Sequence, residues 1–234
     1  MNISDNVSVY ADGLFDWHDG DSGPPICFTN PLIRRMLKLV KAGTNDILYD
    51  LGCGWAQNLL IASTEFGVKN CVGIEKLKSR HAIASQRVRK RGLTKRVRVL
   101  RGNYEQLFTG KIPNADLSKA TIVVHALTTG PKFIDDLSRI LRQNCRVVYY
   151  NLTLSPEIKP SAVDYPFYVS KFPFDIPISE VDWLTSVIPP SGNMAPKTAK
   201  VLWNELVHDY NVEGVGKSAI LDYQRRLKVV LRKP

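Results

Sequence analysis

Short apolar runs alternate with longer segments of helical character along the first 150 residues. The segments with helical character are 32–40, 58–66, 78–91 and 133–141. Short runs rich in Val, Ile and Tyr predict strands at 46–51, 71–75, 97–100, 120–124 and 146–150. Because strands and helices take turns, the pattern predicts an α/β fold. We expect a doubly wound, mostly parallel sheet with helices on both faces.

The helix predicted over 32–40 carries signals at both of its ends. Asn30, or Thr29 one residue earlier, is a suitable N-cap, and Pro31 fits the first turn. Gly43 is the residue expected to end the helix, because glycine adopts the left-handed conformation that follows many helices.

The last third of the chain has a different character from the rest. Eight prolines punctuate it, at 156, 160, 166, 173, 177, 189, 190 and 196. A sixth strand is predicted at 167–172, a helix at 197–210 and a last strand at 227–231, which brings the predicted sheet to seven strands. We therefore expect one domain over 24–234, with a proline-rich elaboration or insertion at about 155–216, after an acidic segment at 1–23.

Composition narrows the environment in which the chain works. Residues 1–23 contain five aspartates and neither lysine nor arginine, the reverse of a signal or transit peptide. No segment is apolar enough for its length to cross a bilayer, so we expect a soluble, cytoplasmic protein without membrane contact. The four cysteines and four histidines lack ligand spacing, so neither a disulfide nor a metal site is predicted. No pattern specifies an oligomeric state.

The net charge is positive, with 32 Lys plus Arg against 22 Asp plus Glu. Much of the excess lies in the predicted basic helix and its approach, residues 76–91. Such a segment predicts RNA or DNA contact, or docking of a protein that is itself bound to nucleic acid. A merely solvated basic face explains the same charges equally well.

A glycine turn follows the first predicted strand. Asp50 ends that strand, and Gly52-Cys53-Gly54 leads into the next helix. This strand, turn and helix is how open α/β sheets receive adenosine-containing ligands, because glycine lets the ligand approach the backbone closely. The dinucleotide fingerprint requires a further Gly or Ala where this chain has Gln57, which argues against NAD or FAD.

The run Asp50-Leu51-Gly52-Cys53-Gly54-Trp55-Ala56 resembles the first motif of class I S-adenosylmethionine-dependent methyltransferases, with Ala56 at the usual third glycine. The resemblance implies that S-adenosylmethionine is the cofactor. It also implies a ribose-binding carboxylate at Glu75, which ends the second strand, and adenine contacts from Asn103 and Tyr104 after the third.

Residues 24–155 are similar to the compact protein lysine methyltransferases of archaea and their non-SET, seven-strand relatives. In that family the segment that precedes the first helix closes over the cofactor. The resemblance therefore implies that the Thr29 hydroxyl reaches the methionyl carboxylate and that Phe28 walls the acceptor channel. Capping of the helix and ordinary core packing are the alternative roles of these two residues.

The residues after the fourth strand bear on the acceptor. Base methylation usually uses an Asn/Asp-Pro-Pro-aromatic tetrad, whereas this chain has His125-Ala126-Leu127-Thr128. Carbon-five methylation of pyrimidines needs a nucleophilic cysteine near that strand, and Cys145 is elsewhere. Lysine methylation needs only an aligned, neutral amine. The acceptor-site candidates are Phe28, His125, Thr128 and Tyr149, with Tyr150 and Trp183 as further channel walls.

The sequence therefore favours a protein lysine methyltransferase whose substrate is a protein, including one associated with nucleic acid. Two alternatives stay open. An RNA methyltransferase would use the same basic charge to bind phosphates directly. A noncatalytic, cofactor-binding partner protein would keep the fold without turnover, although Asp50, Glu75 and Asn103 together argue against it.

Overall fold

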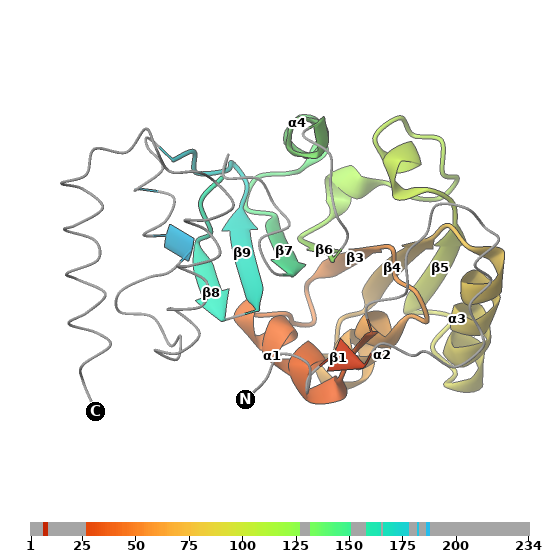
Figure 1. The fold of residues 1–234 in the computed structure, drawn as a ribbon. Coiled ribbons are helices and arrows are strands. Elements are labelled where there is room, and N and C mark those ends of the chain that lie inside the picture. The colour runs from red at the N-terminus through yellow and green to blue at the C-terminus, as the bar shows by residue number, and fades with distance from the viewer. Residues whose placement is uncertain are drawn as a thin grey trace, which may run out of the picture.

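A seven-stranded mixed sheet organises the described part of the chain (Figure 1). The computed structural model describes residues 7–8, 27–126, 132–150, 158–164, 166–177, 182 and 186–187. The strands are β3 (Ile47–Leu51), β4 (Asn70–Glu75), β5 (Val97–Arg101), β6 (Ile122–His125), β7 (Arg146–Tyr150), β8 (Ala162–Asp164) and β9 (Phe167–Lys171). This architecture confirms the Rossmann-like fold predicted from the sequence.

The strand order fixes where a ligand can bind. The order is β5-β4-β3-β6-β7-β9-β8, and the first five strands are parallel. Strand β9 is antiparallel to both of its neighbours. The chain winds in one direction from β3 to β5 and in the other from β6 onwards. The carboxyl ends of β3 and β6 therefore flank the switch point, where open α/β sheets bind ligands.

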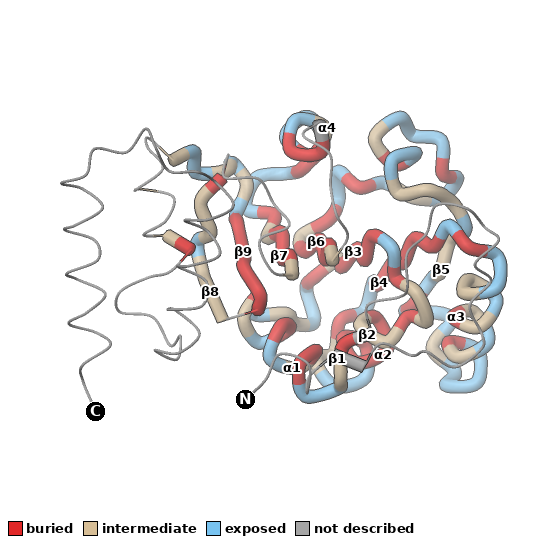
Figure 2. Tube along the Cα trace, in the orientation of Figure 1, coloured by how far each residue is buried: buried red, intermediate tan, exposed pale blue. Residues whose placement is uncertain are grey.

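Helices cover both faces of the sheet (Figure 1). On one face lie α1 (Asn30–Leu39), α2 (Gln57–Glu65) and α3 (Lys78–Lys90), and on the other lies α4 (Lys132–Ile140). Two short 3-10 helices, η2 (Tyr104–Leu107) and η3 (Leu117–Lys119), lie in the connection from β5 to β6. Each face has its own apolar core, and the inner strands β4, β3, β6, β7 and β9 are buried along most of their length (Figure 2).

The edge of the sheet differs from the sequence prediction. Strand β8 was not predicted, because three half-buried residues are too short to show an alternating pattern. A two-residue ladder between β1 (Val7–Ser8) and β2 (Cys27–Phe28) was missed for the same reason. The predicted helix at 197–210 and strand at 227–231 lie outside the described residues, as does most of the acidic segment 1–23.

The ends of α1 also differ from expectation. Thr29 occupies the N-cap position, but its side chain makes no capping hydrogen bond. At the other end the helix stops at Leu39, and Lys41 rather than Gly43 takes the left-handed conformation, with φ of 51°. The backbone N–H of Ala42 then donates to the Leu37 carbonyl at 2.9 Å. This bond closes the helix, and the left-handed residue that accompanies it, Lys41, lies two residues before the glycine that was expected in that role.

A polar network ties the amino ends of the strands together. The buried Asp46 carboxylate accepts hydrogen bonds from the Thr121 hydroxyl at 2.7 Å and from the Gly43 backbone N–H at 2.8 Å. Arg146 at the start of β7 pairs with the same carboxylate and donates to the Val40 and Lys41 carbonyls. The network joins α1, β3 and β7 at the edge opposite the glycine turn.

Candidate functional site

The glycine turn has an unusual backbone path between β3 and α2. Gly52, Gly54 and Ala56 all have positive φ, at 84°, 51° and 64°. The first two are glycines, which adopt this conformation at no steric cost. Ala56 is the N-cap of α2 and is fully buried, so the third position of the motif keeps a conformation that favours glycine although it carries a methyl group.

Hydrogen bonds lock the turn onto β4. The backbone N–H groups of Gly52 and Cys53 both donate to the Ile74 carbonyl at 2.9 Å, and Gly54 donates to Glu75 Oε2 at the same distance. The side chain of Cys53 is buried, and burial raises the pKa of its thiol. A Cβ placed on Gly54 would meet nothing within 4 Å. The turn therefore offers a ligand open space above Gly54. It offers no free amides at 52–54, because these are already bonded within the protein.

Two buried carboxylates lie beside the turn. Asp50 is 3% exposed and accepts a hydrogen bond from the Asn58 amide at 3.1 Å. Burial raises the pKa of Asp50 to about 7, and the nearby Glu75 charge adds to the rise. Burial also raises the pKa of Glu75, against the opposing effect of its backbone hydrogen bonds. The site thus concentrates electron-rich groups that favour hydroxyl donors and cations.

Glu75 is held at both of its carboxylate oxygens. Oε2 accepts from Gly54, and Oε1 accepts from the Leu77 backbone N–H at 2.8 Å. The backbone N–H of Lys76 also hydrogen-bonds to this carboxylate. A carboxylate has about four acceptor sites, so the group is oriented in advance and keeps acceptor capacity for a further donor.

Arg87 on α3 belongs to the site, and sequence reasoning missed it. Its guanidinium donates to the Trp55 carbonyl at 2.9 Å and to the Gln57 side-chain oxygen, so that it brackets Ala56. Gln57 in turn donates to the Asn30 side-chain oxygen at 2.7 Å. These contacts connect α3, the glycine turn and the first residue of α1, which lies next to Thr29.

Asn103 and Tyr104 lie at the start of η2, after β5. The Asn103 side chain caps this short helix by accepting from the Glu105 backbone N–H at 3.2 Å, and it donates to the Glu105 carboxylate at 3.0 Å. Gln106 completes the cap by accepting from the Asn103 backbone N–H. Both residues lie at the carboxyl edge that holds Glu75, since Gly102 donates from its backbone to the Glu75 carbonyl.

His125 is fully buried at the end of β6. Its ring stacks on Phe133 of α4 with centroids 4.3 Å apart, and Tyr104 approaches its edge at 5.6 Å. Phe108 packs against the same group through Phe133. His125 is thus part of an aromatic cluster that joins η2 to α4. Thr128, the other candidate on this connection, lies outside the described residues.

The aromatic residues proposed as channel walls separate into two groups. Phe28 packs on Tyr150 at 5.0 Å and on Phe167 at 5.2 Å, at the carboxyl end of β7. Tyr149 lies on the opposite face, where it stacks on Tyr168 and its hydroxyl lies 3.3 Å from that of Ser170. Successive residues of a strand point to opposite faces, so Tyr149 and Tyr150 do not line one channel. Trp183 lies outside the described residues.

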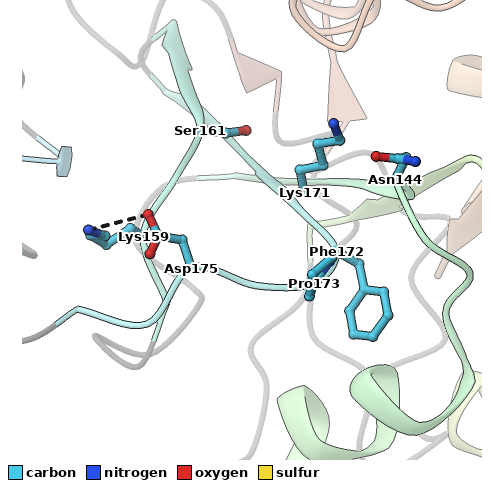
Figure 3. Close-up of a pocket in the computed structure, with 7 residues that line it drawn as sticks. All are labelled: Asn144, Lys159, Ser161, Lys171, Phe172, Pro173 and Asp175. Atoms are coloured by element: carbon cyan, nitrogen blue, oxygen red, sulfur yellow. Dashed lines mark ion pairs between the residues drawn. The ribbon is translucent and has the colours of Figure 1, made fainter.

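A polar pocket of about 300 Å³ lies near the amino ends of the parallel strands (Figure 3). Lys171 at the end of β9 lines it, and in the register of the sheet Lys171 lies opposite Arg146, the first residue of β7. Lys159 in the same pocket forms an ion pair with Asp175 at 3.2 Å. The pocket is therefore remote from the glycine turn. Among the described residues no group of three or more His, Cys, Asp or Glu side chains is arranged to hold a metal ion.

The described helices give no membrane-spanning segment, since none combines the necessary length with an apolar composition.

Comparison with known proteins places this chain in a family. The family model described as mycolic acid cyclopropane synthetase matches residues 32–229. A protein-lysine N-methyltransferase of Saccharolobus islandicus (strain REY15A) is 32% identical over 125 residues, which is 53% of this chain and 73% of that protein.

A solved structure gives the same result for the fold. The RNA methyltransferase of Salinibacter ruber, in complex with S-adenosyl-L-homocysteine, superposes with a TM-score of 0.55 and 25% identity. The match covers 66% of this chain and 98% of that one. The chain belongs to the mycolic acid cyclopropane synthetase family and is a class I S-adenosylmethionine-dependent methyltransferase.

Proposed function

We propose that this methyltransferase transfers its methyl group to the ε-amino group of protein lysines. The observation that carries the proposal is the chemistry of the carboxyl edge. It presents buried carboxylates and aromatic rings, while its described histidine, His125, is buried in an aromatic cluster. Such an edge suits an acceptor that is nucleophilic once it loses a proton to water. The lysine methyltransferase relative from Saccharolobus supports the same assignment.

S-adenosylmethionine is the methyl donor, and it supplies an electrophilic methyl group on a sulfonium. The residues described above fit such a molecule. Glu75, which its backbone hydrogen bonds hold in place, would accept hydrogen bonds from the ribose hydroxyls. Asp50 would face the cationic part, and Gly54 would leave room for the chain of atoms between them. Thr29 and the segment around Asn103 and Tyr104 are proposed to close over the two ends.

We expect Glu75→Gln to weaken the binding of S-adenosylmethionine roughly tenfold to hundredfold, since hydrogen bonds to a charged group contribute about 1.5–3 kcal/mol. The amide keeps the shape of the carboxylate but provides only one acceptor oxygen. Isothermal titration calorimetry measures the change. Glu65→Gln is the matched control, because Glu65 lies at the end of α2 that is away from the glycine turn, where it forms an ion pair with Arg34. Equal affinities in the two folded variants would remove Glu75 from the site.

The acceptor side of the site must deliver lysine as a neutral amine. Lysine in water has a pKa of about 10.4, and transfer into an apolar channel lowers that pKa because the ammonium loses hydration. Phe28 and Tyr150 are the aromatic pair placed to form such a wall. The reaction then requires alignment behind the methyl group and no enzyme base. Cys71 and Cys145 are poor alternatives as nucleophiles, because burial raises the pKa of each thiol to about 12.

Labelled cofactor tests the acceptor directly. We expect label to enter proteins of an RNA-free extract, to appear as methyl-lysine on hydrolysis, and to enter at a rate that rises above neutral pH. His125→Phe, which keeps the ring stack on Phe133, should retain substantial turnover in alkaline buffer. Loss of turnover at every pH, in a variant that still binds cofactor, would make His125 a catalytic residue and contradict the proposal.

RNA methylation is the second candidate function. The similarity to the Salinibacter RNA methyltransferase, which extends over 98% of that chain, and the net charge of +10 favour it. Label that enters protein-free RNA and not protein would establish it in place of lysine methylation. Binding of cofactor with no transfer to either substrate class would instead favour the noncatalytic alternative.

A further inference from the structure

One end of the sheet carries a concentrated positive charge. Residues 76–104 contain eleven lysines and arginines and no aspartate or glutamate. They form α3 and the edge strand β5, which pack together at one end of the sheet (Figure 1). We call this surface, residues 76–101, the basic edge. It includes the helix segment whose charge the sequence analysis singled out, and the structure extends it across the turn at 91–96 and along β5.

The charges on the basic edge face solvent. Nine of the eleven basic residues are exposed, and the outer surface of α3 is exposed along its length (Figure 2). Within the described part of the chain, none of these nine forms an ion pair. The largest group is Arg89, Lys90, Arg91, Lys95 and Arg96, which ends α3 and leads into β5. Arg87 differs from them because it points inward to the glycine turn.

The basic edge lacks the features that a protein interface needs at its centre. Among the described residues, Ile176 is the one exposed large hydrophobic side chain, and it lies after β9 at the other end of the sheet. Protein interfaces usually bury apolar or aromatic anchors. Single-stranded nucleic acid is bound on exposed aromatic rings. The aromatic ring in this stretch is that of Tyr104, which packs on Phe108, His125 and Phe133.

We propose that the basic edge binds the phosphate backbone of double-stranded nucleic acid without reading its sequence. A duplex presents one negative charge per about 1.7 Å of its axis, and arginine and lysine bind phosphates without apolar anchors. Lys76 follows Glu75 in the chain, and Arg101 of β5 lies opposite Glu75 of β4 in the register of the two strands. The basic edge therefore lies directly beside Glu75. A duplex on the basic edge would hold the enzyme close to proteins bound along the same duplex. The proposal is independent of which acceptor is methylated.

Fluorescence anisotropy with a labelled DNA duplex of random sequence tests the proposal. A footprint of about four phosphates predicts that affinity falls about a hundredfold between 50 and 200 mM salt. The triple variant R89E/K90E/R91E should bind the duplex at least tenfold more weakly than wild type at low salt. The control K38E/K41E/R142E makes the same charge change with exposed residues around α1 and before β7, and it should keep most of the affinity.

Three results would overturn the proposal: equal duplex binding by the two triple variants, salt-independent binding, or tighter binding of a polyglutamate peptide than of the duplex. The affinity of both variants for S-adenosylmethionine should stay at the wild-type value, which shows that they are folded. Because that measurement and the labelled-methyl assay do not involve the duplex, failure here leaves the proposed lysine activity unaffected, and the reverse also holds.

Discussion

Asp50→Asn is expected to stabilise the cofactor-free protein above pH 7, by up to about 4 kcal/mol. Asp50 has a folded-state pKa of about 7 and an ordinary value of 3.8, because burial disfavours its charged form. Between these values folding takes up a proton, so the wild-type free energy of unfolding falls as pH rises from about 4 to 7 and is then level. The asparagine variant escapes this loss. Its advantage should grow across that window and vanish below about pH 4.

Urea denaturation at several pH values measures the difference between Asp50→Asn and wild type. The exposed carboxylate Asp135 on α4 gives the control, since Asp135→Asn removes the same charge without relief of burial. The stabilised variant should also bind S-adenosylmethionine more weakly, because the cationic part of that molecule would lose its counter-charge. An unchanged difference from pH 4 to 8 would mean that the Asp50 carboxylate is ionised throughout and that its burial costs little.

Gly73→Ala should destabilise the protein by about 3 kcal/mol and disturb the glycine turn. Gly73 lies buried in β4, opposite Asp50 of β3. A Cβ there would lie 2.5 Å from Cys53 Sγ, 2.8 Å from Cys53 Cβ and 2.6 Å from Leu59 Cδ1. These distances are too short for carbon and sulfur, so the turn and α2 must shift. Both the urea midpoint and the affinity for S-adenosylmethionine should fall.

A double-mutant cycle identifies the cause. Cys53→Gly removes two of the three closest atoms and leaves the mobile end of Leu59, so the loss on adding Gly73→Ala should be much smaller in that background. Gly43→Ala is the control, because a Cβ at Gly43 meets nothing within 4 Å. Additive losses in the cycle would show that strain in β4 itself, rather than contact with the turn, is responsible.

The sequence was sufficient to predict the parallel core and the place where β3 meets the glycine turn. Strong local signals made this possible: apolar runs for β3 to β7, and a carboxylate in the last two residues of both β3 and β4. The structure brings the two predicted features together, because Gly54 of the turn donates a hydrogen bond to Glu75, 21 positions later in the chain. The edge strand β8 carried no such signal, because it is short and only half buried.

Features that depend on tertiary contacts were not predictable from local pattern. Arg87 looked like one of many cations on a basic helix, and only the packing of α3 on β4 and β5 brings it to Trp55 and Gln57, some 30 residues away. Tyr149 and Tyr150 were both plausible channel walls, but successive side chains of β7 point to opposite faces of the sheet. Asn103 was assigned to the adenine, whereas its side chain also has a local role as the cap of η2.

The bracket that Arg87 forms around Ala56 has an evolutionary consequence. A glycine at this position would adopt the left-handed backbone unaided, whereas alanine costs about 1 kcal/mol or more there. Arg87 holds the Trp55 backbone carbonyl before that residue and the Gln57 side chain after it, and these two hydrogen bonds offset the cost. Positions 56 and 87 should therefore vary together among relatives. Lineages with alanine should keep arginine on the helix, and those with glycine should be free to lose it.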